Sequence, residues 1–179
     1  MPPPDVIALR TVRLRRPRLA DAEAILEYGS DPEVARYADW PVRSDLASLR
    51  ELLHDRAARW TSGAEYYWVI TERERDGAIG GSCCRVTGDA AEVGFLVHRQ
   101  FWGRGIATVA CTAVVAWLWS VPTVRRVWAT CDAENLASAR VLEKVGLRHE
   151  RTLLQATVRP NLSPEPRDTQ VYARELGAE

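Results

Sequence analysis

The sequence has no excess of either charge and no long apolar run. Its 24 Lys and Arg are balanced by 24 Asp and Glu, whereas a nucleic-acid-binding protein needs a basic face to neutralise phosphates. No stretch approaches the roughly 20 apolar residues that cross a bilayer. The start, Met-Pro-Pro-Pro, also lacks the charged and apolar regions of a signal peptide. We therefore expect no nucleic-acid partner, no membrane partner and a cytoplasmic location.

Signals for metals and disulfides are missing as well. The four cysteines include no C-x-x-C pair, and the three histidines fall in no metal-ligand pattern. The adjacent Cys83 and Cys84 would point to opposite faces of a strand, which is typical of buried, reduced thiols. The sequence predicts no metal site and no disulfide scaffold.

The amino-acid composition is typical of one globular domain. The chain has 179 residues, of which 46% are hydrophobic and 27% charged, and this is enough for one packed core. Three consecutive prolines at positions 2–4 are incompatible with a helix or a paired strand there. We expect a flexible tail over residues 1–6 and a single domain over residues 7–177.

Hydrophobic periodicity switches between the spacing of helices and that of strands, which predicts a mixed α/β (α+β) fold. The predicted helices cover residues 19–28, 44–60, 105–119 and 135–145. The predicted strands cover residues 9–15, 66–71, 78–86, 91–97, 124–130, 147–158 and 169–174, and the second to the fourth form an antiparallel meander. Arg13 and Arg15 alternate with apolar residues, so we place them on the solvent side of the first strand. We expect the proline-rich segment 160–166 to be a surface loop.

Residues 93–108, which read VGFLVHRQFWGRGIAT, carry the most informative pattern. A strand runs through a glycine-containing loop into a helix, and a helix N-terminus offers unpaired amide groups to a phosphate. No Gly-Lys-Ser/Thr follows and G-x-G-x-x-G is absent, so a nucleotide P-loop and a dinucleotide fingerprint are excluded. Taken alone, the segment fits two interpretations equally well. It is either a phosphate cradle or a tight turn that only begins a helix.

The string from Phe101 to Thr108 resembles the signature of the GCN5-related N-acetyltransferase (GNAT) superfamily, in its branch that acetylates ribosomal-protein N-termini and small amines. The signature, Q/R-x-x-G-x-G/A, fits from Gln100 or from Trp102, and the second start matches the branch's Tyr/Phe-Trp-Gly-Lys/Arg-Gly-x-Ala-Thr. The resemblance implies a mixed, mostly antiparallel sheet of seven strands with splayed central strands and about four helices. It also implies acetyl-coenzyme A (acetyl-CoA) as cofactor. Backbone amides would hold its pyrophosphate at Gly103, Arg104, Gly105, Ile106, Ala107 and Thr108.

A second segment, from Asn135 through Ser138 to Gly146, resembles the family's element beside the pantetheine arm. Asn135 is also a good helix N-cap, and both roles are compatible. The resemblance further implies that pantetheine adds to Phe95, Leu96 and Val97 like a short extra strand. It assigns the amide that stabilises the oxyanion to Leu96 or Val97.

The resemblance also suggests catalytic roles. Glu92 is the candidate base, although a solvated glutamate at a strand edge is an equal alternative, and His98 has a suitable ordinary pKa. Many members place a tyrosine seven residues after the helix asparagine, where this chain has Leu142. Ser138 is therefore the candidate donor to the departing sulfur.

The sequence says less about the acceptor substrate than about the cofactor. Trp40, in a predicted loop among aromatic residues, is the candidate for one wall of its site. We expect an N-acetyltransferase that acts on a protein N-terminus or a small-molecule amine by direct attack in a ternary complex. The alternative is a non-catalytic module that binds or senses acyl-CoA. The sequence leaves open whether the protein is a monomer or a homodimer.

Overall fold

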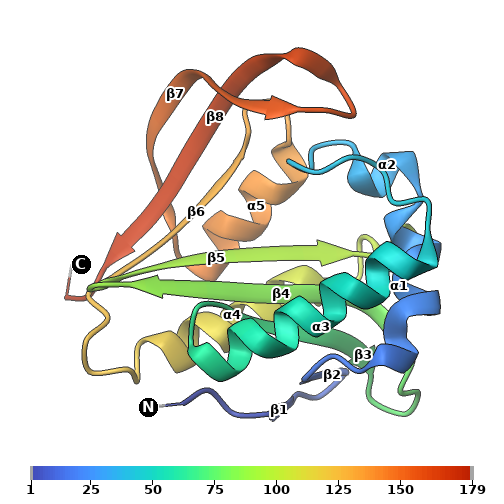
Figure 1. Ribbon diagram of the computed structural model, residues 1–179. Coiled ribbons are helices and arrows are strands. Elements are labelled where there is room, and N and C mark those ends of the chain that lie inside the picture. Colours follow the sequence, from blue (N-terminus) through green and yellow to red (C-terminus); the bar gives the residue numbers. More distant parts are fainter. Residues whose placement is uncertain (1, 178–179) are drawn as a thin grey trace.

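The computed structural model describes residues 2–177, which form one twisted sheet with helices on both of its faces (Figure 1). Within these residues the sheet has eight strands in the order β1-β2-β3-β4-β5-β6-β8-β7. Their bounds are β1 Val6–Ala8, β2 Val12–Arg15, β3 Tyr66–Glu72, β4 Ala78–Thr87, β5 Ala90–Val97, β6 Arg126–Asp132, β7 Arg148–Arg159 and β8 Ser163–Glu175.

Five α-helices and two short 3-10 helices accompany this sheet in the described chain. They are η1 Leu19–Asp21, α1 Ala22–Gly29, α2 Pro32–Ala35, α3 Leu46–Ser62, η2 Arg99–Phe101, α4 Ile106–Leu118 and α5 Leu136–Val145. Helices α1 and α3 cross one face of the central strands, and α4 lies behind the other face (Figure 1). Among residues 2–177, no helix has the length and apolar character needed to cross a membrane.

The meander of β3, β4 and β5 is antiparallel, which confirms the prediction for these segments. Alternate residues of each strand enter two different cores, one beneath α4 and one beneath α1 and α3. Cys84 lies in the first core and Cys83 packs against the second, as expected for neighbours on a strand. All four cysteines are free thiols.

Strands β5 and β6 are parallel but remain paired over only three residues each, Ala90–Glu92 with Arg126–Trp128. Beyond that point β6 continues to pair with β8 as far as Asp132. Residues 93–97 of β5 therefore have no strand on that side, and the two strands diverge in Figure 1. The predicted splay of the central strands is confirmed, and we call the unpaired interval between β5 and β6 the slot.

The structure differs from the predicted elements at three places. Strand β1 and helix α2, of three and four residues, were not expected, because such short elements carry too little periodicity to be recognised. The expected loop 160–166 is instead mostly strand, since β8 begins at Ser163 and Pro166 pairs with Val158. Proline is tolerated there because this end of β8 lies beyond its pairing with β6 and has a neighbour on one side only.

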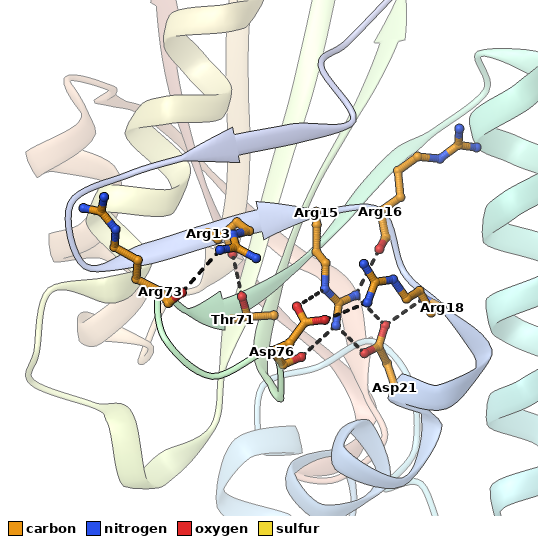
Figure 2. Close-up of polar contacts among 8 residues, drawn as sticks. All are labelled: Arg13, Arg15, Arg16, Arg18, Asp21, Thr71, Arg73 and Asp76. Atoms are coloured by element: carbon orange, nitrogen blue, oxygen red, sulfur yellow. Dashed lines mark hydrogen bonds and ion pairs between the residues drawn. The ribbon is translucent and has the colours of Figure 1, made fainter.

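Arg15 is buried, so the expectation that it lies on the solvent side of its strand is wrong. Its guanidinium donates to Asp21 at 2.7 and 2.8 Å and to Asp76 at 2.7 Å, and Arg18 binds the same Asp76 (Figure 2). The two carboxylates come from η1 and from the β3–β4 loop. The ion pairs thus connect β2, η1 and the β3–β4 loop, and they compensate the cost of burying the charge.

Candidate active site

The loop between β5 and α4 presents free amide groups to solvent. Gly103 and Gly105 have φ angles of 74° and 73°, a backbone conformation that favours glycine. Gly105 is the N-cap of α4, and the first amide bond back to it comes from Val109 at 3.0 Å. Within residues 2–177, the amides of residues 106–108 donate no hydrogen bond. A Cβ on either glycine would meet nothing within 4 Å, so the loop is open to an anion.

Trp102 holds this loop against the end of β5. Its indole Nε1 donates to the carbonyl oxygen of Val97 at 2.7 Å, while half of the side chain remains exposed. The side chain at the start of the preferred signature register therefore contacts the protein's own backbone. Arg104, by contrast, is exposed, with its guanidinium carbon 5.0 Å from the centre of the Phe101 ring.

The edge of β5 that faces the slot has its peptide groups free at alternate residues. The amide of His98 donates to Ile79 of β4 at 2.8 Å, and the ladder pairs Leu96 with Gly81. In an antiparallel ladder the amide and carbonyl groups of alternate residues point to the same side. The peptide groups of Leu96 therefore face β4, as the amide of His98 does. Those of Phe95 and Val97 point into the slot. Of the two expected oxyanion donors, the geometry leaves Val97.

The N-terminus of α5 follows the end of β6. Asn135 is the N-cap, because its Oδ1 accepts from the Ser138 amide at 3.1 Å. The Ser138 hydroxyl makes no hydrogen bond within the described residues. Leu142 lies one turn further on and is buried in the core beneath α4, with 1% of its surface exposed. It packs as a hydrophobic residue where the resembled family commonly has a tyrosine.

Glu92 is the last residue of β5 that pairs with β6, so it stands where the slot begins. Its carboxylate lies 3.3 Å from Arg85 Nη1, and Arg85 also binds the buried Glu65 at 2.8 Å. The side chain lies on the face that α1 and α3 cover, together with Gly94 and Leu96. Glu92 is therefore a partly exposed carboxylate in an ion-pair network, not an isolated glutamate at a strand edge.

His98 is placed less favourably for the role of base. Its Nδ1 accepts a hydrogen bond from the Gln100 amide at 3.1 Å. Its Nε2 lies 3.7 Å from a Glu27 carboxylate oxygen. The Nδ1 lone pair is therefore engaged by the protein's own backbone and does not point freely to an incoming amine.

The loop between α2 and α3 is tied to the turn between β7 and β8 by one side chain that sequence reasoning missed. Asn161 donates to the carbonyl oxygens of Ala35 at 2.7 Å and Trp40 at 2.9 Å, and it accepts from the Val42 amide at 3.0 Å. Trp40 lies in this loop, as predicted, with the Arg43 guanidinium 4.5 Å from its ring centre. No local pattern marks Asn161, because its partners are more than a hundred residues away.

Burial suppresses the reactivity of the thiols. It raises the pKa of Cys83 and Cys131 to about 11 and that of Cys111 to about 12. It raises the pKa of Cys84 as well. A cysteine nucleophile must be ionised to react, so these side chains are poor candidates for a covalent acyl intermediate.

Comparison with known proteins identifies the class. The family model for the acetyltransferase (GNAT) domain matches residues 11–148, more than three quarters of the chain. The chain belongs to this family, which confirms the resemblance seen in the sequence. It is therefore an acyltransferase that depends on acetyl-CoA.

Individual relatives are similar to this chain in sequence or in fold. The uncharacterized N-acetyltransferase p20 of Bacillus licheniformis is 26% identical over 143 residues, covering 78% of this chain and 80% of its own. The ribosomal L7/L12 alpha-N-protein acetyltransferase RimL, solved with coenzyme A, shares the fold with a TM-score of 0.84 at 21% identity, covering 97% and 99% of the two chains. The Microcin C7 self-immunity acetyltransferase MccE, solved with acetyl-CoA and AMP, has a TM-score of 0.85 at 16% identity, covering 97% and 98%.

Proposed function

We propose that the protein transfers the acetyl group of acetyl-CoA to a primary amine, either a protein N-terminus or a small-molecule amine, by direct attack in a ternary complex. The observation that carries this proposal is the slot between β5 and β6, which leads to the unpaired amides at the start of α4. A free strand edge next to a helix N-terminus suits an extended ligand with a diphosphate at one end.

The cofactor would lie along this path. Amides of Gly103, Arg104, Gly105, Ile106, Ala107 and Thr108 would receive the pyrophosphate. The pantetheine amides would then pair with the free peptide groups of Phe95 and Val97, as an added strand pairs with a sheet edge. Asn135 and Ser138, at the start of α5, would border the other side of the pantetheine.

The chemistry follows from three groups near the slot. The Val97 amide would donate to the thioester oxygen and stabilise the negative charge that forms as the amine attacks. Glu92 would accept the proton that the amine loses, directly or through a water molecule. The carbon–sulfur bond then breaks, and the Ser138 hydroxyl would donate to the departing thiolate. The high pKa values of the four thiols support attack by the amine itself over a cysteine intermediate.

The sequence left a non-catalytic acyl-CoA-binding module as the second candidate. Membership of the acetyltransferase family opposes it, although the buried Leu142 can supply no proton to a thiolate. Turnover separates the two candidates: an enzyme releases coenzyme A in the presence of an amine, and a sensor binds the cofactor without release.

The test measures coenzyme A release with a panel of peptides and small amines, in the wild type and in Glu92→Gln and Ser138→Ala variants. We expect amine-dependent release in the wild type and a clear loss of kcat in each variant. Activity within about twofold of wild type in both variants would remove these two residues from the mechanism. Tight cofactor binding without turnover on any amine would favour the sensor.

A further inference from the structure

Two arginines between α1 and α3 have no acidic partner in the described residues. Arg43 lies in the loop before α3, and Arg56 lies on the face of α3 that turns toward β3. Among residues 2–177, neither guanidinium donates a hydrogen bond, and neither lies within 4.0 Å of a carboxylate. The neighbouring carboxylates are engaged elsewhere: Glu65 and Glu92 bind Arg85, and Glu27 faces His98.

Both guanidinium groups are half-buried against aromatic rings. The Arg56 carbon Cζ lies 3.4 Å from the centre of the Tyr67 ring, and Arg43 stacks over Trp40. Arg43 is also anchored, because its amide donates to the Gly29 carbonyl oxygen at 3.1 Å. Burial, and then the positive charge of Arg56, lower the pKa of Arg43. Holding two like charges in partly desolvated positions costs free energy unless an anion joins them.

A buried hydroxyl lies in the same cluster. The side chain of Tyr28, on α1, is only 1% exposed, and its hydroxyl lies beside the Tyr67 side chain and has no other hydrogen-bond partner in the described residues. Two free guanidinium groups beside a buried hydroxyl form a donor set that suits an oxyanion.

The cluster lies next to the end of the slot. The Tyr67 side chain extends from Arg56 across β4, where its hydroxyl fills the space that a Cβ on Gly81 would need. Gly81 pairs with Leu96 on β5, and the next residue, Val97, has its amide in the slot. An acceptor that reaches the Val97 amide from the side of α1 and α3 therefore passes the arginines.

We propose that Arg43 and Arg56 bind an anionic oxyacid group of the acceptor, so that the protein prefers amines that also carry a carboxylate or a phosphate. This inference rests on the proposed function and adds the chemical class of the acceptor. The charged group is held between α3, Trp40 and Tyr67, while the amine reaches the slot.

The test compares matched amines that differ only in the anionic group. Suitable pairs are γ-aminobutyrate and its amide, phosphoethanolamine and ethanolamine, and peptides with Asp or Asn at the second position. In the wild type we expect kcat/KM to favour at least one charged member by about tenfold, the size of one charge-assisted contact. The pair that shows the preference identifies carboxylate or phosphate as the bound group.

The variants Arg43→Met and Arg56→Met test the source of the preference. Each is expected to bring the charged-to-neutral ratio close to one while leaving kcat/KM for the neutral amines within about twofold. Arg43→Lys and Arg56→Lys keep the charge but lose the planar fork, so they should retain part of the ratio. Arg59→Met is the matched control, because Arg59 lies on the same helix, exposed, and pairs with Asp55 at 2.8 Å.

The outcomes are distinct. Acetylation of neutral and charged amines with equal kcat/KM in the wild type would overturn the inference and leave the proposed function standing. A preference that persists in both methionine variants, with thermal melting showing them folded, would also overturn it. Cofactor binding with no acetylation of any amine would overturn the proposed function and, with it, the inference.

Discussion

The indole N–H of Trp102 donates to the carbonyl oxygen of Val97 at 2.7 Å. This bond joins the loop proposed to bind the pyrophosphate to the residue whose amide is proposed to face the thioester. One side chain therefore links the two ends of the proposed cofactor path. The arrangement shows why a tryptophan can stand at the first position of the signature, where the wider family has Gln or Arg.

Removing this bond should loosen the cradle without unfolding the protein. Trp102→Phe keeps an aromatic ring on the loop but loses the donor, so we expect a loss of about 1 kcal/mol in the free energy of unfolding. The dissociation constant for coenzyme A should rise in parallel, because the loop amides lose their fixed position. Isothermal titration and urea unfolding measure the two effects. Trp119→Phe is the control, since the indole of Trp119 donates no hydrogen bond within the described chain. An unchanged affinity in Trp102→Phe would contradict the role of the bond.

Gly105→Ala tests the cradle itself. Alanine at a positive φ costs about 1 to 2 kcal/mol, and its methyl group would project into the space proposed for the pyrophosphate. We expect lower stability together with a large loss of coenzyme A affinity. Gly88→Ala is a matched control, since Gly88 has a φ of 63° in the β4–β5 turn and equally open surroundings. It should lose stability but retain affinity, and an equal loss of affinity in both variants would contradict the assignment.

Arg15→Met should lower the free energy of unfolding without changing the rate of acetyl transfer. The substitution leaves the buried Asp21 without its partner, which typically costs about 3 to 5 kcal/mol. Denaturant unfolding at neutral pH measures this loss. The kcat of the folded variant should equal that of the wild type, because β3 and β4 lie between β2, which carries Arg15, and the slot beside β5. A selective loss of kcat with normal stability would be inconsistent with this account.

The same ion pairs predict a dependence of stability on pH. The hydrogen bond from Arg15 is the main cause that holds the pKa of Asp76 below its ordinary value. A depressed carboxyl pKa stabilises the folded state above the unfolded pKa of about 3.9, and this contribution is lost as the pH falls through the folded pKa. Wild-type stability should therefore decrease below about pH 4. The decrease should be shallower in Arg15→Met, as thermal melts across this range can show.

The buried thiols should be dispensable for acetyl transfer. Because burial raises their pKa, we expect Cys83→Ala and Cys131→Ala to retain most of the wild-type kcat. The native protein should also react slowly with a thiol reagent at neutral pH, and quickly once unfolded. An acetylated cysteine trapped by mass spectrometry, together with inactivity of the matching alanine variant, would replace direct attack with a covalent route.

Local sequence patterns were sufficient for the parts of the fold that depend on local chemistry. The meander follows from runs of aromatic and β-branched residues, and α4 follows from its buried apolar stripe. The glycines of the cradle stand out because Gly103 and Gly105 precede a strongly apolar helix. The family resemblance then supplied the splay between β5 and β6, which no periodicity of either strand contains.

Contacts between distant segments could not be predicted. The burial of Arg15 depends on Asp76, which is 61 residues away, and the α2–α3 loop depends on Asn161. Arg43 and Arg56 likewise come near each other, beside Tyr67, only when the loop, α3 and β3 are packed together. Each of these residues looks like an ordinary surface side chain until its partners are known.

A crystal structure with coenzyme A bound tests the central claim most directly. We predict that the diphosphate oxygens accept hydrogen bonds from amides within residues 103–108, and that the pantetheine pairs with Phe95 and Val97 between β5 and β6. A hollow of about 580 Å³ lies elsewhere, beside α5 and β7, and is lined in part by Gly146, Arg148 and Glu150. Coenzyme A bound there, with the slot between β5 and β6 empty, would contradict the account.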